Sequence, residues 1–412
     1  MISGGMDMSK GKSAVCICRH SGETLKKVFD ILHSEEDLDS LCMLIEEYAQ
    51  QEEVRVVMEA TGIYHLPVLM HLKEAGIFVA VINPLLMKKF AAQTLRRGKS
   101  DKRDAIKIAS YGIEKWYQLE DYSPEQEIYE ELRLMGRHYT HYTGLKVKAK
   151  QNLTCVLERT MPGITTLLPF DHTGYGKKDK LLDFVEEYWH YDNITAMCKK
   201  DFILHYAKWA NKNGYHANEG KAAAIYDLAQ RSVTSLSSGR SSSRFLLQQA
   251  VRALRNMTEI AADILSAMNE LAKELPEYST VRQMDGVGEV LAVRLIAEIG
   301  DVRRFHSPGA LVAYAGIDSP EFQSGTFTST SRHISKRGSA LLRKTGYEIM
   351  QSLKRIRCEH NPVYQYMMKK EMEGKPKKVC KIAGLNKFLR IYYAKVKQCR
   401  NEGFPSVRVK VA

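Results

Sequence analysis

Apolar and polar residues follow two different periods along this chain. In the first 115 or so residues, short apolar runs bounded by polar or turn residues are typical of strands, and they lie at 14–18, 24–31, 54–58 and 76–82. Helical spacing fills the intervals at 38–48 and 63–75. A hairpin followed by strand–helix–strand units predicts a mixed sheet with helices packed on it.

Two later stretches have apolar residues at alternating intervals of four and three. They run from Ile128 to Val156 and from Leu247 to Leu275. Such heptads indicate long helices that share a coiled-coil seam, either with each other or with another subunit, and two amphipathic helices in an ordinary bundle are the alternative. Between them, residues 162–244 mix helical spacing with a serine-rich linker, Ser232 to Ser243, and no motif assigns their role.

These changes of pattern predict three parts. They are an α/β domain over 1–120, a helical coiled-coil region over 121–275 with 162–244 inserted, and a mainly helical domain over 276–412. Near the start of the third part, Gly286 and Gly288 resemble the turn of a helix-hairpin-helix, where backbone N–H groups at a helix start can bind phosphate. A turn that merely joins two helices fits these glycines equally well.

Positive charge is concentrated at the C-terminal end. The 412 residues carry 61 Lys and Arg and 48 Asp and Glu, a net charge of +13, whereas 331–412 alone hold 21 basic and 5 acidic residues, a net +16. This predicts a polyanionic partner, most simply a nucleic acid, although charge alone does not exclude an anionic membrane surface or a merely solvated basic face. We expect a phosphate contact from Lys10. We expect others from basic residues on predicted helices after residue 331, namely Lys336, Arg337, Arg343 and Lys344.

Cysteine usage and hydropathy indicate the compartment. The eight cysteines form no Cys-x-x-Cys pair, and we find no histidine at ligand spacing beside them, which argues against a zinc module or a disulfide framework. No apolar run approaches the roughly 20 residues that span a bilayer. The first residues lack a charged flank followed by an apolar stretch. We therefore expect a soluble, cytoplasmic protein with no membrane partner.

Four carboxylates stand where a sheet-based nuclease needs them. Asp7 lies on or near the first strand, Glu59 directly follows the apolar run 54–58, and Asp101 and Asp104 are spaced to share one face of a helix. Mg²⁺ prefers oxygen ligands and is usually held by a few carboxylates. Each acid alone fits an ordinary solvated or helix-start residue. Glu59 differs, because an acid at the end of an apolar strand is costly unless it is solvated or bound.

Three short segments together resemble the DEDD motif of the IS110 family of insertion-sequence transposases. They are 5–10, 58–65 and 99–105, each containing one or two of the four acids. In the C-terminal half, 286–288, 314–317, 323–325 and 334–338 are similar to the transposase domain of that family. The resemblance runs in order from residue 5 to about 390. It implies an α/β RNase H-like, RuvC-like N-terminal domain and a mainly α C-terminal domain.

The resemblance also implies a mechanism. Family members are recombinases in which the acids, here Asp7, Glu59, Asp101 and Asp104, bind Mg²⁺ while a serine attacks DNA and forms a phosphoserine link. A structured guide RNA, the bridge RNA, pairs with donor and target double-stranded DNA. The serine corresponds to Ser324, and Ser335 is the next candidate in the same stretch.

Two catalytic centres on one chain suggest sites shared between subunits, so we expect a homo-oligomer, at least a dimer and a tetramer on paired DNA ends. Two other functions fit the sequence. One is a structure-selective nuclease of the RuvC type that uses water. The other is a non-enzymatic, basic nucleic-acid-binding protein in which the acids cap helices.

Overall fold

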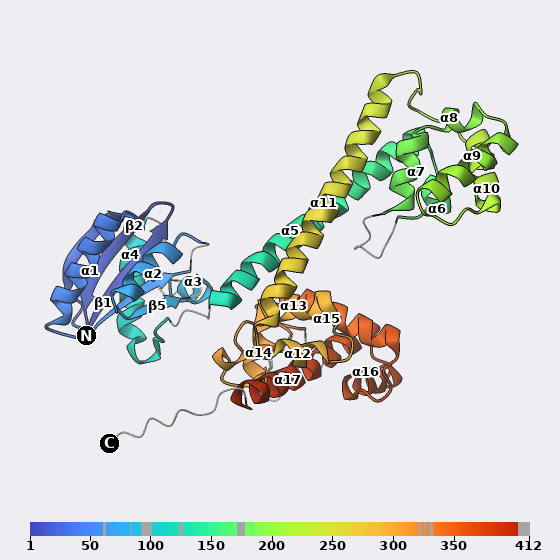
Figure 1. The fold of residues 1–412 in the computed structure, drawn as a ribbon. Coiled ribbons are helices and arrows are strands. Elements are labelled where there is room, and N and C mark those ends of the chain that lie inside the picture. The colour runs from blue at the N-terminus through green and yellow to red at the C-terminus, as the bar shows by residue number, and fades with distance from the viewer. Residues whose placement is uncertain are drawn as a thin grey trace. The chain divides into compact units, whose positions relative to one another are not determined.

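The computed structural model divides the chain into two compact units, residues 1–124 and 125–412 (Figure 1). It describes residues 1–60, 63–82, 84–91, 101–122, 127–170, 178–319, 323–324, 327–328 and 333–402. None of the helices in these ranges is long and apolar enough to cross a membrane.

The first unit is built on a five-stranded mixed sheet. Its strands are β1 (Ile2–Ser9), β2 (Lys12–Arg19), β3 (Thr24–Leu32), β4 (Val54–Glu59) and β5 (Val79–Ile82). The strand order is β3-β2-β1-β4-β5, with β1, β2 and β3 antiparallel and β4 and β5 parallel to β1. The expected mixed α/β sheet is confirmed, and it is consistent with an RNase H-like domain. No apolar run in the sequence marks the central strand β1, because this strand contains Gly4 and Gly5.

Helices cover both faces of this sheet. Alternating residues of each strand point to opposite faces, and on one face they pack against α1 (Glu35–Ala49) and α2 (Leu66–Glu74) in a core that includes Met6 and Met58. The other face carries small residues of β2 against α4 (Asp101–Glu114). α3 (Pro84–Ala91) adds Met87 to a third cluster on this second face.

The second unit contains two long helices that pack along each other. They are α5 (Glu127–Thr160) and α11 (Ser241–Lys273), as Figure 1 shows. The prediction of two long helices from the heptads is confirmed, and each has the other as its partner within this chain. Their supercoiling stays a prediction.

Residues 162–170 and 178–240 fold into a small helical body at one end of this pair (Figure 1). Its helices are α6 (Ile164–Leu167), α7 (Lys180–Tyr188), α8 (Tyr191–Thr195), α9 (Lys199–Lys212) and α10 (Glu219–Arg231). They enclose an aromatic core that includes Phe184, Tyr206 and Trp209, and Leu153 of α5 and Leu247 of α11 complete it. The serine-rich stretch expected to be a linker, Ser232 to Ser243, overlaps α11, because its last three residues form the first turn of that helix.

The remaining helices pack at the other end of α5 and α11 (Figure 1). They are α12 (Tyr278–Arg282), α13 (Glu289–Ile299), α14 (Pro308–Tyr314), α15 (Ala340–Ile356), α16 (Pro362–Met372) and α17 (Lys377–Glu402). Their common core takes in Leu132 of α5 and Met268 of α11. The mainly helical C-terminal part is thereby confirmed.

A buried polar cluster ties this core together. The Arg400 guanidinium lies 3.1 Å from the Glu277 carboxylate and 2.8 Å from that of Asp301, and it also contacts the Tyr129 hydroxyl, which donates to Glu277. The side chain of Arg400 is 2% exposed. Buried charges of this kind are tolerated only when they are paired.

Candidate active site and nucleic-acid interface

Two glycines let α4 lie directly on β1. A Cβ on Gly5 would stand 2.1 Å from the backbone nitrogen of Ala109 and 2.4 Å from the carbonyl oxygen of Ala105. A Cβ on Gly112 would stand 2.1 Å from the Ser3 hydroxyl. Ser3 therefore lies beside the end of α4 and Gly5 beside its middle, so the helix runs antiparallel to the strand. The start of α4 consequently lies at the C-terminal end of β1.

Asp7 faces this start. It lies two residues beyond Gly5 on the same face of β1, about 6.6–6.8 Å farther along the strand. At about 1.5 Å per helical residue, that distance corresponds to four or five residues of α4. Counting back from the Ala105–Ala109 contact gives the first turn of α4, which carries Asp101 and Asp104.

Glu59 joins them from the neighbouring strand. β4 is parallel to β1, and Met58 pairs with Met6, so Glu59 and Asp7 are the next residues along the two strands. The face is the same, because a Cβ on Gly112 of α4 would stand 2.8 Å from Val57, two residues before Glu59. The fold therefore brings the four predicted acids to one edge of the sheet, on the face that α4 covers.

The environment of these acids fits a hard cation. Asp7, Glu59 and Asp104 are half-buried and Asp101 is exposed. The Asp104 carboxylate forms an ion pair with Lys107 at 2.8 Å, one turn along the same helix. All four offer carboxylate oxygens, the donor that Mg²⁺ prefers, and two of them lie in the first turn of a helix, where its dipole favours negative charge.

The predicted nucleophile lies in a short hairpin. β6 (Gln323–Ser324) pairs with β7 (Phe327–Thr328), and Ser324 is opposite Phe327. The side chain of Ser324 lies outside the described atoms. The alternative serine, Ser335, is engaged elsewhere, since its hydroxyl donates to the Asp318 carboxylate and its backbone N–H donates to the Asp318 carbonyl at 2.8 Å.

These bonds close the base of the segment that carries Ser324. Besides the two bonds between residues 335 and 318, the Lys336 N–H donates to the Gly316 carbonyl at 3.0 Å. A Cβ on Gly338 would stand 1.9 Å from the Tyr314 carbonyl oxygen, so only glycine fits there. Both ends of 319–334 are thus held together against the end of α14.

The basic residues of this region are arranged differently from the prediction. Lys336 and Arg337 are exposed but precede α15 instead of lying on a helix, and Lys336 has a left-handed backbone, φ 53°. Arg343 is half-buried and donates to the Ala315 carbonyl at 2.9 Å, which supports the base of the serine segment. Lys344 is exposed in the first turns of α15.

The predicted glycine turn does join two helices. Gly286 has φ +78°, and a Cβ there would stand 2.7 Å from Leu353 of α15. Gly288 is exposed at the start of α13 and is followed by Glu289. In the first unit, Lys10 is exposed in the turn after β1, at the same end of that strand as Asp7.

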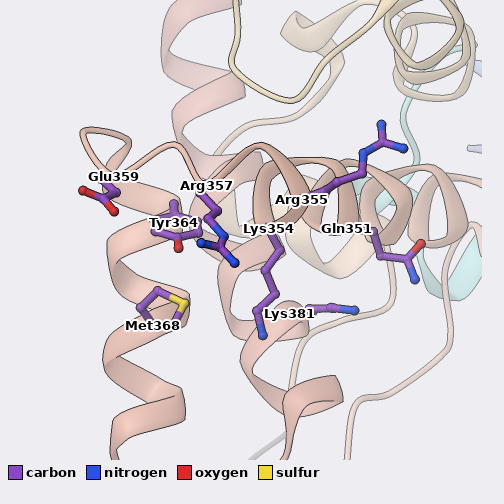
Figure 2. Close-up of a pocket in the computed structure, with 8 residues that line it drawn as sticks. All are labelled: Gln351, Lys354, Arg355, Arg357, Glu359, Tyr364, Met368 and Lys381. Atoms are coloured by element: carbon purple, nitrogen blue, oxygen red, sulfur yellow. The ribbon is translucent and has the colours of Figure 1, made fainter.

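A basic pocket of about 610 Å³ lies beside α15 and was not singled out from the sequence. Lys354, Arg355, Arg357 and Lys381 line it together with Tyr364. Figure 2 shows the side chains of Lys354 and Arg357 reaching into the same hollow. The pattern of the sequence showed that this region is basic, but not which cations share a concave surface.

A second group was missed because one spacing was overlooked. Among the described side chains, one group could hold a metal ion through three residues, and it consists of Asp285, Cys358 and His360. Their ligand atoms all lie within 4.8 Å of one another. The acids of the first unit are not part of so tight a group. Our expectation that no cysteine has a histidine at ligand spacing is wrong, because Cys358 and His360 are two residues apart.

Comparison with known families covers both units. Residues 4–162 match a family model described as a transposase, of the DEDD type of IS110 elements, and residues 278–365 match the model of the transposase IS116/IS110/IS902 family.

Individual proteins agree with these matches. An uncharacterized 44.8 kDa protein of insertion element IS116 from Streptomyces clavuligerus is 22% identical over 90% of this chain and 88% of its own. The transposase for insertion sequence element IS1111A of Coxiella burnetii is 31% identical over 22% of this chain and 24% of its own. A pilin gene-inverting protein of Moraxella bovis is 23% identical over 84% of this chain and 81% of its own.

Among solved structures, Thermus thermophilus RuvC in complex with a Holliday junction substrate is similar at 15% identity. It covers 29% of this chain and 96% of its own, with a TM-score of 0.22.

Proposed function

Because this chain belongs to the IS110 family of insertion-sequence transposases, we propose that it exchanges strands between donor and target DNA by an Mg²⁺-dependent, RNA-guided reaction with a phosphoserine intermediate. The observation that carries the proposal is the convergence of four carboxylates from β1, β4 and α4 on one edge of the sheet. Like charges at one edge repel each other, and a divalent cation bound between them would relieve that repulsion.

In this proposal the acids hold Mg²⁺. Asp7 and Glu59 are fixed by paired strands, and Asp101 and Asp104 by the first turn of α4, so the oxygen donors come from rigid elements. When bound, Mg²⁺ stabilises negative charge on the phosphate oxygens during strand cleavage. Lys107, paired with Asp104, neutralises part of the carboxylate charge and is placed to contact a phosphate there.

Ser324 supplies the nucleophile. A serine hydroxyl is a poor nucleophile near neutral pH and needs a base or a metal ion beside it. Ser324 lies in a segment held at both ends, whereas the hydroxyl of Ser335 is already committed to Asp318. This difference favours Ser324 over Ser335 as the attacking residue.

The basic surface binds the nucleic acids. Exposed Lys336, Arg337 and Lys344 stand beside the segment that carries Ser324, and phosphate contacts of this kind give affinity with little sequence information. Base pairing to a bridge RNA supplies the sequence selection. The backbone of Gly286 and Gly288 and the side chain of Lys10 would add phosphate contacts. A dimer or a tetramer would bring Ser324 and the acids of different subunits to one DNA strand.

The test uses the full-length protein with its co-purified RNA, which sequencing identifies, and matching donor and target DNA. Wild type and Ser335→Ala should form a covalent DNA adduct with Mg²⁺ that leaves a peptide on the DNA end after protease digestion. Ser324→Ala and Asp7→Asn should form none and still bind DNA. Metal-dependent cleavage without a peptide would instead indicate a nuclease that uses water, and binding without any cleavage would indicate a non-enzymatic protein.

A further inference from the structure

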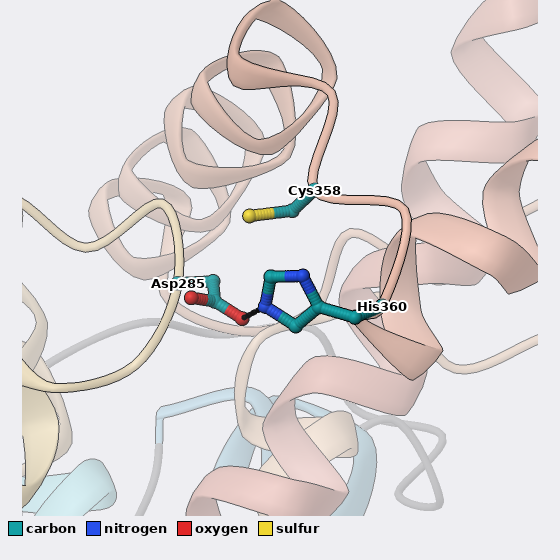
Figure 3. A group of neighbouring side chains, drawn as sticks. All are labelled: Asp285, Cys358 and His360. Carbon is teal, nitrogen blue, oxygen red and sulfur yellow. Dashed lines mark ion pairs between the residues drawn. The ribbon is translucent and has the colours of Figure 1, made fainter.

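We propose that Asp285, Cys358 and His360 form a binding site for a divalent transition metal of the zinc type, distinct from the carboxylates of the first unit. The site lies between the turn that precedes α13 and the loop 357–361 that joins α15 to α16. In Figure 3 the carboxylate, the thiol and the imidazole of these residues face the same small space.

The distances suit one shared ion. The ligand atoms all lie within 4.8 Å of one another, and the imidazole Nε2 of His360 lies 3.5 Å from the Asp285 carboxylate. Zinc binds thiolate at about 2.3 Å and imidazole or carboxylate at about 2.0–2.2 Å, so its tetrahedral ligands are about 3.3–3.8 Å apart. His360 is 79% exposed, which leaves its ring free to complete that geometry.

Both segments that carry the ligands are fixed in the core. Arg357 ends α15 in a left-handed conformation, φ 50°, which turns the chain so that Cys358 lies toward Asp285. Asn361 begins α16, and its amide donates to the Asp285 carboxylate at 2.8 Å. A hydrogen bond of this kind orients a metal-binding carboxylate. On the other side, Gly286 packs against Leu353.

The donor set selects the class of metal. A thiolate, an imidazole and a carboxylate suit zinc and similar ions, whereas Mg²⁺ and Ca²⁺ prefer oxygen ligands alone. Three protein ligands leave a fourth position for water or for a ligand from solution. On binding, the Cys358 thiol loses its proton to solvent as the metal–sulfur bond forms, so no oxidant or reductant is needed.

Metal binding here would act on the basic pocket. Arg357 and Glu359 line that pocket from the same loop that carries Cys358 and His360. A metal that joins this loop to Asp285 would hold Arg357 in place beside Lys354. The site would therefore order one wall of the surface expected to bind phosphate.

The test is a titration of the chelator-stripped, full-length protein with Co²⁺, which replaces zinc and reports its ligands. In wild type, thiolate-to-metal charge-transfer absorption and the visible bands of a tetrahedral site should saturate at one Co²⁺ per chain, and Zn²⁺ should remove both. Cys358→Ser should abolish the charge-transfer band. The matched control is Cys155→Ser, because Cys155 is an exposed cysteine on α5 outside any ligand group described here.

Two further variants test whether Co²⁺ binding and the charge-transfer band arise from this site. His360→Gln keeps the thiol and is largely exposed, so it should fold normally while its Co²⁺ affinity falls at least about tenfold. Asp7→Asn, which alters the oxygen ligands of the first unit, should leave the charge-transfer band unchanged. Absence of the band in wild type, or an equal band in folded Cys358→Ser, would overturn the proposal.

Discussion

Replacing Gly5 with alanine should disable the acidic site by moving α4. The added Cβ would stand 2.1 Å from the backbone nitrogen of Ala109 and 2.4 Å from the carbonyl of Ala105. Both neighbours are helix backbone and cannot rotate away as a side chain could. The helix or the strand must therefore move.

The structure gives the size of that movement. Ordinary contacts of a Cβ begin at 3.4 Å, so α4 must withdraw from β1 by about 3.4 − 2.1 = 1.3 Å at Ala109. Overpacking of this kind costs about 1–3 kcal/mol of stability. The first turn of α4, with Asp101 and Asp104, moves away from Asp7. A misplacement of about 1 Å in a catalytic group can reduce a rate by about 10²-fold.

The matched control is the preceding residue of the same strand. A Cβ on Gly4 would meet its nearest neighbour, a methyl of Val56, at 3.6 Å, an ordinary contact, and it points to the opposite face of the sheet. Gly4→Ala and Gly5→Ala would be compared by urea denaturation, by Mn²⁺ binding measured with electron paramagnetic resonance, and by adduct formation on DNA.

We expect Gly4→Ala to behave as wild type and Gly5→Ala to lose Mn²⁺ affinity and most of its strand cleavage while remaining folded. If folded Gly5→Ala binds Mn²⁺ and cleaves DNA as well as Gly4→Ala, then the acids are not positioned by the contact of α4 with β1. The reasoning that places them at one site would then be refuted.

Other consequences can be measured on the second unit. Arg400→Met should lower the free energy of unfolding by about 3–5 kcal/mol in urea, and added Glu277→Gln should recover part of it, because the single variant buries an unpaired carboxylate. A full loss in the double variant would contradict this. Burial raises the pKa of Asp301, but hydrogen bonds from Arg303 and the charge of Arg400 outweigh it and lower the pKa overall. This carboxylate therefore contributes stability above its unfolded pKa of about 3.9 that is lost as the pH falls through the lower folded pKa, so Asp301→Asn should flatten the acid limb of a stability–pH curve. Lys344→Gln should reduce the slope of log affinity for duplex DNA against log salt by about 0.9, whereas exposed Lys273→Gln, paired with Glu270, should leave it unchanged.

The elements were predictable where the apolar period was strong. The heptads of α5 and α11 and the apolar run of β4 marked their elements closely, because burial of one face or of both faces demands that spacing. β1 was not marked by an apolar run. Gly5 serves the close approach of α4 on one face, Gly4 contributes no side chain on the other, and few apolar side chains remain to detect.

The candidate site was predictable only in part, for a physical reason. The four acids could be chosen from their order and from their place at strand and helix ends. Their convergence depends on the parallel pairing of β1 with β4 and on Gly5 and Gly112, which are contacts between segments far apart in the sequence. Asp285 likewise comes close to Cys358 and His360 only because Gly286 packs against α15. The sequence alone therefore does not show that Asp285 belongs to this group.

The buried cluster of Arg400 has a consequence for synthesis of the protein. Its guanidinium contacts Tyr129, 271 residues earlier in the chain. The ribosome must therefore translate almost the entire message before this cluster can form, whereas the compact first unit consists of residues 1–124, which are translated first. A transcript cut short before codon 400 would yield a polypeptide in which Glu277 and Asp301 lack the guanidinium that pairs with both of them.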